Sequence, residues 1–389
     1  MKKSVLIAFS ILPILVILLL FVQAALTTSQ LHDQAKTNAT NFVITTMQYC
    51  SPPPNSGSGA TLEDRVYTAL ATGLCGDYVA NAQQQDSGCF PSDYGGTCDV
   101  QRTAQAVLAL YLTEKSAANK SEYSTQIDAA TKWLAQKNRT SSDIQWYVQL
   151  DSNSPITCAV NDSLGKILNV AMGSDKKLTK AATSTSTCLG ISPNGYWIQP
   201  GSCQVKGVRC FGGGFTITLL YTKAGSNNGV YYVENTTQSF TENTPVVSLD
   251  KAMPSYCITR DDNNNICDYE NTLWAAAALA KASSYSTSVY SPYLSVSQND
   301  DPVDNALLYN LVGGSSLISQ IVGSPNFNIV YPSTAFGSES TSEGYWTSNN
   351  YDDKYLSTGL IHWLLGSNLG STKTSVENWF YDEQESKGS

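Results

Sequence analysis

The spacing of apolar side chains changes twice along the chain. From about residue 61 to residue 138 apolar residues recur every three or four positions, as in residues 127–134, which is typical of amphipathic helices. In residues 144–151 every second residue is apolar, which predicts a half-buried strand. Helical spacing resumes at Asp268. The pattern therefore predicts a β segment inserted between two helical segments.

Several more short apolar runs follow the first predicted strand, and glycine-rich turn signals such as Gly212-Gly213-Gly214 separate them. We interpret this segment as a small all-β sandwich within an otherwise helical chain. The predicted organisation is a helical part at residues 61–143, the inserted sandwich at residues 144–247, and a second helical part at residues 248–389.

The N-terminus predicts export. Lys2 and Lys3 precede an apolar segment, Val5–Val22, which is longer than the 7 to 15 residues of a cleaved signal and close to the roughly 20 needed to span a bilayer. Small residues around Ala24 offer a cleavage site. Residues 1–24 are thus either a membrane anchor, forming a hydrophobic helix, or a signal peptide, and residues 25–60 are a stalk and linker. In both cases the rest of the chain is extracytoplasmic.

The cysteine count agrees with export. Ten cysteines in an exported chain predict disulfides. A zinc site is disfavoured, because no C-x-x-C occurs and His32 and His362 are the only histidines. Proximity suggests the pairs Cys89–Cys98, Cys203–Cys210 and Cys257–Cys267, with Cys158–Cys188 and Cys50–Cys75 completing the set, although the sequence leaves the connectivity open.

Composition narrows the classes of partner. The net charge is −9 and no Lys/Arg cluster follows Lys3, which excludes a nucleic-acid footprint. The 22 tyrosines and seven tryptophans suit a surface that binds a carbohydrate, peptide or protein. The expected partners are the membrane, through the N-terminal segment, and an unidentified surface ligand, protein or glycan. Five N-x-S/T sequons predict glycosylation at Asn38, Asn119, Asn138, Asn161 and Asn235.

The same sequence pattern occurs at two predicted helix starts. Residues 98–110 read CDVQRTAQAVLAL and residues 267–279 read CDYENTLWAAAAL, so each copy places Thr four residues after Asp. An acidic residue at this place accepts backbone N–H groups and complements the helix dipole. A looser third copy runs from Gly344-Tyr345-Trp346 through Asp352-Asp353 to Thr358.

Together with the turn QDSGCF at residues 85–90, these copies resemble the repeats of the α/α-toroid superfamily. That group includes terpenoid cyclases, protein prenyltransferase β subunits and the thioester domains of α-macroglobulins. The resemblance covers about residues 60–140 and 257–389. It implies a mainly α-helical fold, an α/α toroid that is open or incomplete, with the sandwich inserted.

The catalytic motifs of that superfamily are incomplete here. The nearest approach to the D-x-D-D acid of the cyclases is Asn299–Asp304, which fits a loop leading into a helix cap better. A prenyltransferase zinc site would have only His362 as its imidazole, and Cys75-Gly76 is all that remains of a thioester motif. No cofactor or metal is therefore expected.

An enzyme remains as the alternative. Carboxylates could pair at one end of a toroid, although helix caps and solvated turns explain them better. We expect an exported or membrane-tethered cell-surface protein without catalytic activity that binds a ligand or partner. The alternative is an enzyme that acts on an isoprenoid or a glycan in the toroid cavity and uses Asp352, Asp353 and His362 for catalysis. The carboxylates that could form a catalytic pair at one end of the toroid are Asp86, Asp93, Asp99, Asp352 and Asp353.

Overall fold

The computed structural model describes residues 61–386, except residues 95, 117–121, 227–228, 235–236, 248, 250–254, 261–265, 325, 331–342 and 352. The predicted N-terminal helix, stalk and linker lie outside the described residues, as do the sequons at Asn38, Asn119 and Asn235. Within the described part, no helix is both long enough and apolar enough to cross a membrane.

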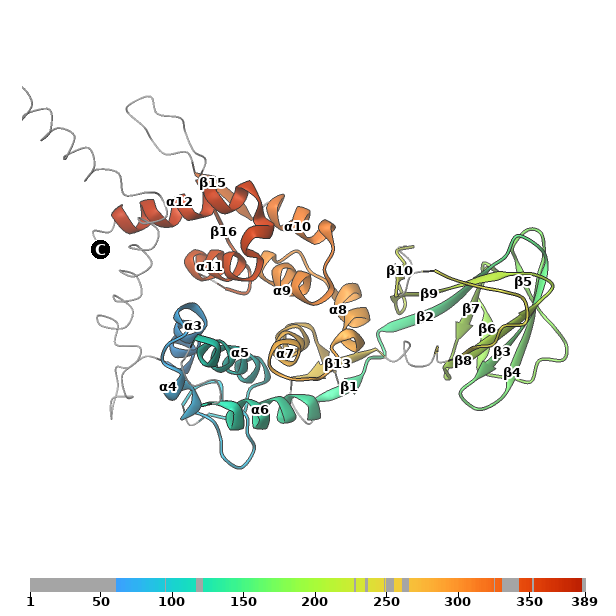
Figure 1. The fold of residues 1–389 in the computed structure, drawn as a ribbon, viewed down its shortest axis with the longest axis horizontal. Coiled ribbons are helices and arrows are strands. Elements are labelled where there is room, and N and C mark those ends of the chain that lie inside the picture. Colours follow the sequence, from blue (N-terminus) through green and yellow to red (C-terminus); the bar gives the residue numbers. More distant parts are fainter. Residues whose placement is uncertain are drawn as a thin grey trace, which may run out of the picture.

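Helices gather in one half of the molecule and a pair of antiparallel sheets forms the other (Figure 1). Two 3₁₀ turns, η3 (Ser288–Tyr290) and η4 (Gly366–Leu369), connect helices in the C-terminal part. The helices are α3 (Leu62–Thr72), α4 (Gly76–Ala80), α5 (Val100–Ser116), α6 (Ser124–Gln136), α7 (Tyr269–Ala282), α8 (Ser291–Ser297), α9 (Pro302–Val312), α10 (Ser315–Val322), α11 (Lys354–Leu365) and α12 (Ser371–Ser386).

The strands form four antiparallel sheets. Two small ones belong to the helical half: β1 (Asn138–Thr140), β13 (Tyr256–Thr259) and β14 (Cys267–Asp268) make one, and β15 (Phe327–Val330) and β16 (Glu343–Trp346) the other. The two large sheets contain β2 (Ile144–Asp151), β3 (Ile156–Asp162), β4 (Ile167–Met172), β5 (Leu178–Lys180), β6 (Leu189–Ile191), β7 (Trp197–Pro200), β8 (Val205–Phe211), β9 (Phe215–Lys223), β10 (Tyr232–Val233), β11 (Gln238–Phe240) and β12 (Val246–Val247).

The prediction of a mainly α-helical toroid is wrong. The chain is a mixed structure with 41% helix and 25% strand, and the helices do not form a toroid. Helix α5 packs on α3 and α7, and α9 packs on α7 and α11, but strands β13 and β16 pack against α7 and α11 as part of the same half. The prediction that the repeats are helices is confirmed, whereas the segments before α7 and α11 are extended and pair as strands.

The two large sheets pack face to face around one hydrophobic core. The first has the order β10-β9-β2-β7-β6, with β11 also paired to β9, and the second has the order β12-β8-β3-β4-β5. Alternate residues of β2, such as Trp146 and Val148, point into this core, where they meet Val160 from the second sheet. The alternation that predicted residues 144–151 as a strand is confirmed.

The chain passes into and out of these sheets at one place. Strand β1 ends just before the sheets and pairs antiparallel with β13, which begins just after them. Thr140 lies opposite Tyr256 in this ladder, so the residues that flank the inserted segment are held about 5 Å apart at this point. The insertion therefore leaves the helical half through two adjacent strand ends.

The disulfides follow this architecture. The predicted pairs Cys89–Cys98 and Cys257–Cys267 are confirmed. The other two predicted pairs within the sandwich are wrong, because Cys158 pairs with Cys210 and Cys188 with Cys203. Cys158 and Cys210 lie directly opposite each other in neighbouring strands β3 and β8, so sheet register, and not closeness in sequence, selects the partner. Cys75 is also disulfide-bonded; Cys50, its predicted partner, lies outside the described residues.

Each repeated helix start is a threonine clasp: a buried threonine of the helix whose hydroxyl bonds the backbone of the preceding extended segment. In the first copy the Thr103 hydroxyl accepts from the N–H of Phe90 (2.9 Å) and donates to the carbonyl of Asp99 (2.6 Å). The Asp99 carboxylate caps α5 by accepting from the N–H of Arg102 (2.7 Å). Thr103 and Phe90 are fully buried, so the clasp satisfies a backbone N–H that water does not reach.

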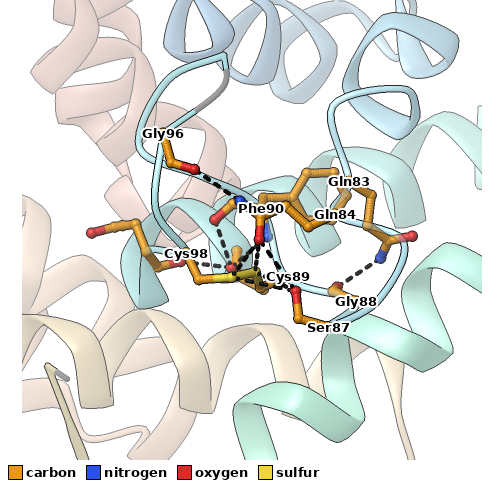
Figure 2. Close-up of a disulfide and its surroundings, with 10 residues drawn as sticks. Gln83, Gln84, Ser87, Gly88, Cys89, Phe90, Gly96 and Cys98 are labelled. Atoms are coloured by element: carbon orange, nitrogen blue, oxygen red, sulfur yellow. Dashed lines mark hydrogen bonds between the residues drawn. A yellow bond between two sulfur atoms is a disulfide. The ribbon is translucent and has the colours of Figure 1, made fainter. Parts of the chain in front are cut away.

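The turn before the first clasp is held by glutamine side chains (Figure 2). The Nε2 of Gln83 donates to the carbonyl of Gly88 (2.8 Å), and the Nε2 of Gln84 donates to the carbonyl of Gly96 (2.8 Å). The Cys89–Cys98 disulfide closes the same loop, which ends where α5 begins. The QDSGCF segment is thus a scaffold for the start of a helix.

The second copy repeats this geometry. The Thr272 hydroxyl accepts from the N–H of Ile258 (2.8 Å) and donates to the carbonyl of Asp268 (2.6 Å). Asp268 caps α7 through the N–H of Asn271 (2.9 Å). The second disulfide joins β13, which holds Cys257, to β14, which holds Cys267.

The third copy divides the same task between two residues. Thr358 accepts from the N–H of Trp346 (3.0 Å), while its neighbour Ser357 donates to the carbonyl of Asp353 (3.0 Å). Asp353 caps α11 by accepting from the N–H of Tyr355 (2.6 Å). The three copies are therefore a structural device for joining an extended segment to a helix.

We expect Thr272→Val to lower the free energy of unfolding by about 1–3 kcal/mol, because valine keeps the shape and leaves the buried N–H of Ile258 without a partner. Thr157→Val is the matched control, since Thr157 is exposed on strand β3. Urea unfolding of the two variants measures the difference. A loss for Thr272→Val no larger than that of the control would contradict the clasp.

The ladder between β1 and β13 predicts that residues 144–247 can be removed. Because the ends of the segment leave from paired strands, a short Gly/Ser linker should join them without moving the helices. We expect the shortened protein to keep its helical circular dichroism and the excised segment to show a β spectrum. Loss of the helical signal in the shortened protein would show that the two halves fold as one unit.

Candidate functional site

The residues predicted for the enzyme alternative do not assemble into a site. Asp353 is the N-cap of α11, and His362 lies near the other end of that helix, about 13 Å further along its axis. His362 instead faces Glu377 of α12, at 3.3 Å between Nε2 and Oε1. Asp352 lies outside the described residues. Asp99 is a helix cap, Asp93 accepts from the N–H of Tyr94 (2.8 Å), and Asp86 is exposed in a turn.

A buried acidic cluster was not anticipated. Asp301 caps α9, as its loop-and-cap interpretation predicted, but Asp304 in the first turn of that helix is fully buried. Burial, with the charges of Asp301 and Glu270, raises the pKa of Asp304 to about 7. Its Oδ2 accepts from the side-chain amides of Asn299 (2.7 Å) and Asn350 (3.0 Å), and among the described residues its Oδ1 has no partner.

Tyrosines surround this cluster. Burial raises the pKa of Tyr269, whose hydroxyl is buried and has no hydrogen-bond partner among the described residues. The hydroxyl of Tyr351 accepts from the indole N–H of Trp274 (2.9 Å), and burial raises its pKa as well. Gln105 of α5 donates to the hydroxyl of Tyr67 on α3 (3.1 Å). Helices α3, α5, α7 and α9 thus carry a polar cluster whose central carboxyl, Asp304, is buried, while Asn299 and Asn350 at its margin are exposed.

Three aromatic rings in the C-terminal part of the helical half surround the side-chain ammonium of a lysine. The ammonium of Lys354 lies 4.9–5.1 Å from the ring centroids of Tyr345, Tyr355 and Trp379. It also pairs with Glu383 at 3.0 Å, and this contact raises the pKa of Lys354. The arrangement fastens α12 to α11 and β16 and leaves no room for a ligand cation.

One group of described side chains has the spacing of a metal site, namely Asp162 with Cys188 and Cys203. The two sulfurs are joined in a disulfide and offer no thiolate to a metal. Burial opposes ionisation of Asp162, but hydrogen bonds from the Ser186 hydroxyl and the N–H of Lys166 outweigh it and hold the pKa of this carboxyl below its usual range. Asp162 is therefore a structural anion.

The outer face of the six-stranded sheet carries an exposed aromatic cluster, which we call the outer-face aromatics: Tyr147, Trp197 and Tyr231. Their ring centroids are 4.6–5.6 Å apart and each pair meets at a tilted or edge-on angle. Tyr231 is 40% exposed, and the other two are half-buried against it and each other. These spacings are those of packed rings, so the cluster presents an edge to solvent and does not form an empty cage.

Amides and hydroxyls extend this surface. Gln149 lies opposite Trp197 on one side and Thr218 on the other, and Gln199 follows on the outward side of β7. In the part of the chain that the structure describes, neither glutamine side chain has a hydrogen-bond partner. Asp151, at the end of β2, is the only charged outward residue of the fully described strands β2, β7 and β9 apart from the terminal Lys223. The face is aromatic, polar and neutral.

Sequence reasoning could have found this face. The alternation that buries Trp146 and Val148 necessarily turns Gln145, Tyr147 and Gln149 outward. It could not place Trp197 or Tyr231 beside them, because that requires the strand order. Of the two predicted sequons within the described residues, Asn161 is exposed on β3, whereas the amide oxygen of Asn138 is buried.

Comparisons with protein-family models, with curated proteins and with solved structures found no match to this chain. The assignment of a function therefore rests on the geometry described above.

The raised pKa of Asp304 predicts a pH-dependent stability. Because its folded-state pKa of about 7 exceeds the unfolded value of about 3.9, the contribution of this carboxyl to stability is fully present below about pH 4 and is lost as the pH rises to about 7. Asp304→Asn should therefore be more stable than the wild type by about 2–4 kcal/mol at pH 8 and equal to it at pH 4. The amide oxygen of the new side chain would keep the contacts of Oδ2.

Unfolding followed by circular dichroism at both pH values measures this effect. The control is Asp86→Asn, which changes an exposed carboxylate in a turn. Equal stability changes in the two variants at pH 8 would show that Asp304 is not destabilised by burial.

Proposed function

We propose that the protein is an extracytoplasmic recognition module that binds a surface ligand through the outer face of the six-stranded sheet. The observation that carries this proposal is the uncharged face formed by the outer-face aromatics and the neighbouring glutamines. Tyrosine and tryptophan contribute large contact areas at a low cost in side-chain entropy, and amides contribute directional hydrogen bonds. Such a combination favours binding of a ligand.

The compartment follows from the disulfides. Four disulfides join described residues, and bonds of this kind persist in oxidising environments outside the cytoplasm. The basic residues and apolar segment at the N-terminus support export. We propose that this segment is retained as a membrane anchor, so that the recognition face is displayed at the cell surface.

The buried acidic cluster favours binding over catalysis. A carboxyl with a pKa near 7 is suited to general acid–base work when it reaches a substrate. Asp304, however, has no exposed surface, and the unpartnered atoms of Asp304 and Tyr269 are sealed in the interior. The outer face of the sheet, in contrast, is open to a large ligand without rearrangement. The interior cluster is therefore assigned to the folded framework, and the sheet to recognition.

The proposal predicts which aromatic residues matter. We expect Trp197→Ala and Tyr231→Ala to weaken binding of the purified full-length protein, kept in detergent, to the lipid-extracted envelope of its own cells by about tenfold each, since such residues dominate binding energy. Trp363→Ala and Tyr285→Ala are matched controls, because these residues are exposed on the helical half. Sedimentation with the envelope fraction measures binding, and circular dichroism verifies folding. Equal binding by all four variants would exclude the sheet face.

A further inference from the structure

We infer that the ligand of this face is a neutral glycan, an inference that rests on the proposed function and specifies its ligand. Three properties of the face lead to this class of ligand: its lack of charge, its free amides, and the aromatic edge beside them.

The lack of charge disfavours ionic partners. Asp151 stands at the end of β2 and is paired with Lys176 at 2.8 Å, so its charge is already balanced. Along β2, β7 and β9 the other outward residues are glutamine, threonine, leucine and aromatic side chains. An acidic or basic ligand would lose its hydration here without gaining an opposite charge. A neutral ligand avoids this cost.

The free amides require a ligand with many hydroxyls. Gln149 and Gln199 each offer a donor group and an acceptor group, while Gln145 is already engaged with the carbonyl of Pro200 (3.2 Å). Sugar hydroxyls both donate and accept, so they match an amide in either orientation. Gln149 lies directly between Trp197 and Thr218, which places the polar contact beside the aromatic one. A sugar, which carries both hydroxyls and apolar C–H groups, can contact the amide and the aromatic edge together.

A peptide fits less well. A peptide that adds to a sheet pairs with an edge strand, and the strands that carry this face, β2, β7 and β9, are interior, so a peptide added at β6 or β10 would not cover it. A proline-rich peptide needs a groove between separated aromatic rings, whereas the outer-face aromatics are packed together at 4.6–5.6 Å. The flat surface that remains suits an extended polymer lying across the strands.

The inference is tested with the envelope fraction and the purified full-length protein. The fraction is treated either with periodate, which cleaves the vicinal diols of sugars, or with protease. We expect periodate to abolish binding and protease to leave it unchanged. In parallel, the affinity of the protein is measured by titration with neutral oligosaccharides of four to six units built from glucose, mannose, galactose or N-acetylglucosamine. A proline-rich peptide and an acidic oligosaccharide are titrated separately for comparison.

Two variants separate a glycan from other ligands. Gln149→Leu and Gln199→Leu retain the shape of the face and remove the amides, so binding of a glycan should fall about tenfold while circular dichroism is unchanged. Trp363→Ala again provides the control. Binding that survives periodate and is lost with protease would overturn the glycan inference but leave the recognition face intact if Trp197→Ala still weakens it. Preference for the peptide or the acidic oligosaccharide would also overturn it. Binding that is independent of Trp197 would remove the proposed function itself.

Discussion

The helical half depends on one recurrent hydrogen bond, in which a buried threonine or serine near the start of a helix bonds the backbone of an extended segment. The side chains of Thr103, Thr272 and Thr358 are completely buried. Each hydroxyl accepts a hydrogen bond from the backbone N–H of a residue that is itself fully buried. A buried N–H without a partner is costly, so the position of the helix start is fixed within one residue. The succession of helices, and the loops between them, are arranged around these fixed points.

This hydrogen bond explains why the helix starts could be predicted from the sequence and why the short strands before them could not. The Asp-x-x-x-Thr pattern located the helix starts because the cap and the clasp use side chains that are visible in the sequence. The extended segments that the clasps hold, Tyr256–Thr259 and Glu343–Trp346, are too short to show a period of two. The helices alone therefore suggested a toroid, and the short strands of the helical half, unlike those of the predicted β insertion, were missed.

The predicted disulfide pairing in the sandwich was wrong for a related reason. Strand β8 contains a register shift where it pairs with β3, and as a result Gly207 and Val208 are both buried and the alternation breaks. Without β8 as a strand, Cys210 could not be placed opposite Cys158. Likewise, β2 showed its outward residues clearly, but the recognition face also needs Trp197 and Tyr231, which only the strand order brings together.

The single passage between the two halves has a mechanical consequence. Tension on the sandwich enters the helical half at Thr140 and Tyr256, the same end of the β1–β13 ladder. When two antiparallel strands are pulled apart from one end, their residue pairs separate one after another. An antiparallel pair resists this direction of load weakly. The second residue pair of the β1–β13 ladder contains Cys257, whose disulfide to Cys267 joins β13 to the start of α7. On the β13 side, extension under load would thus be stopped by this covalent link before it reached α7.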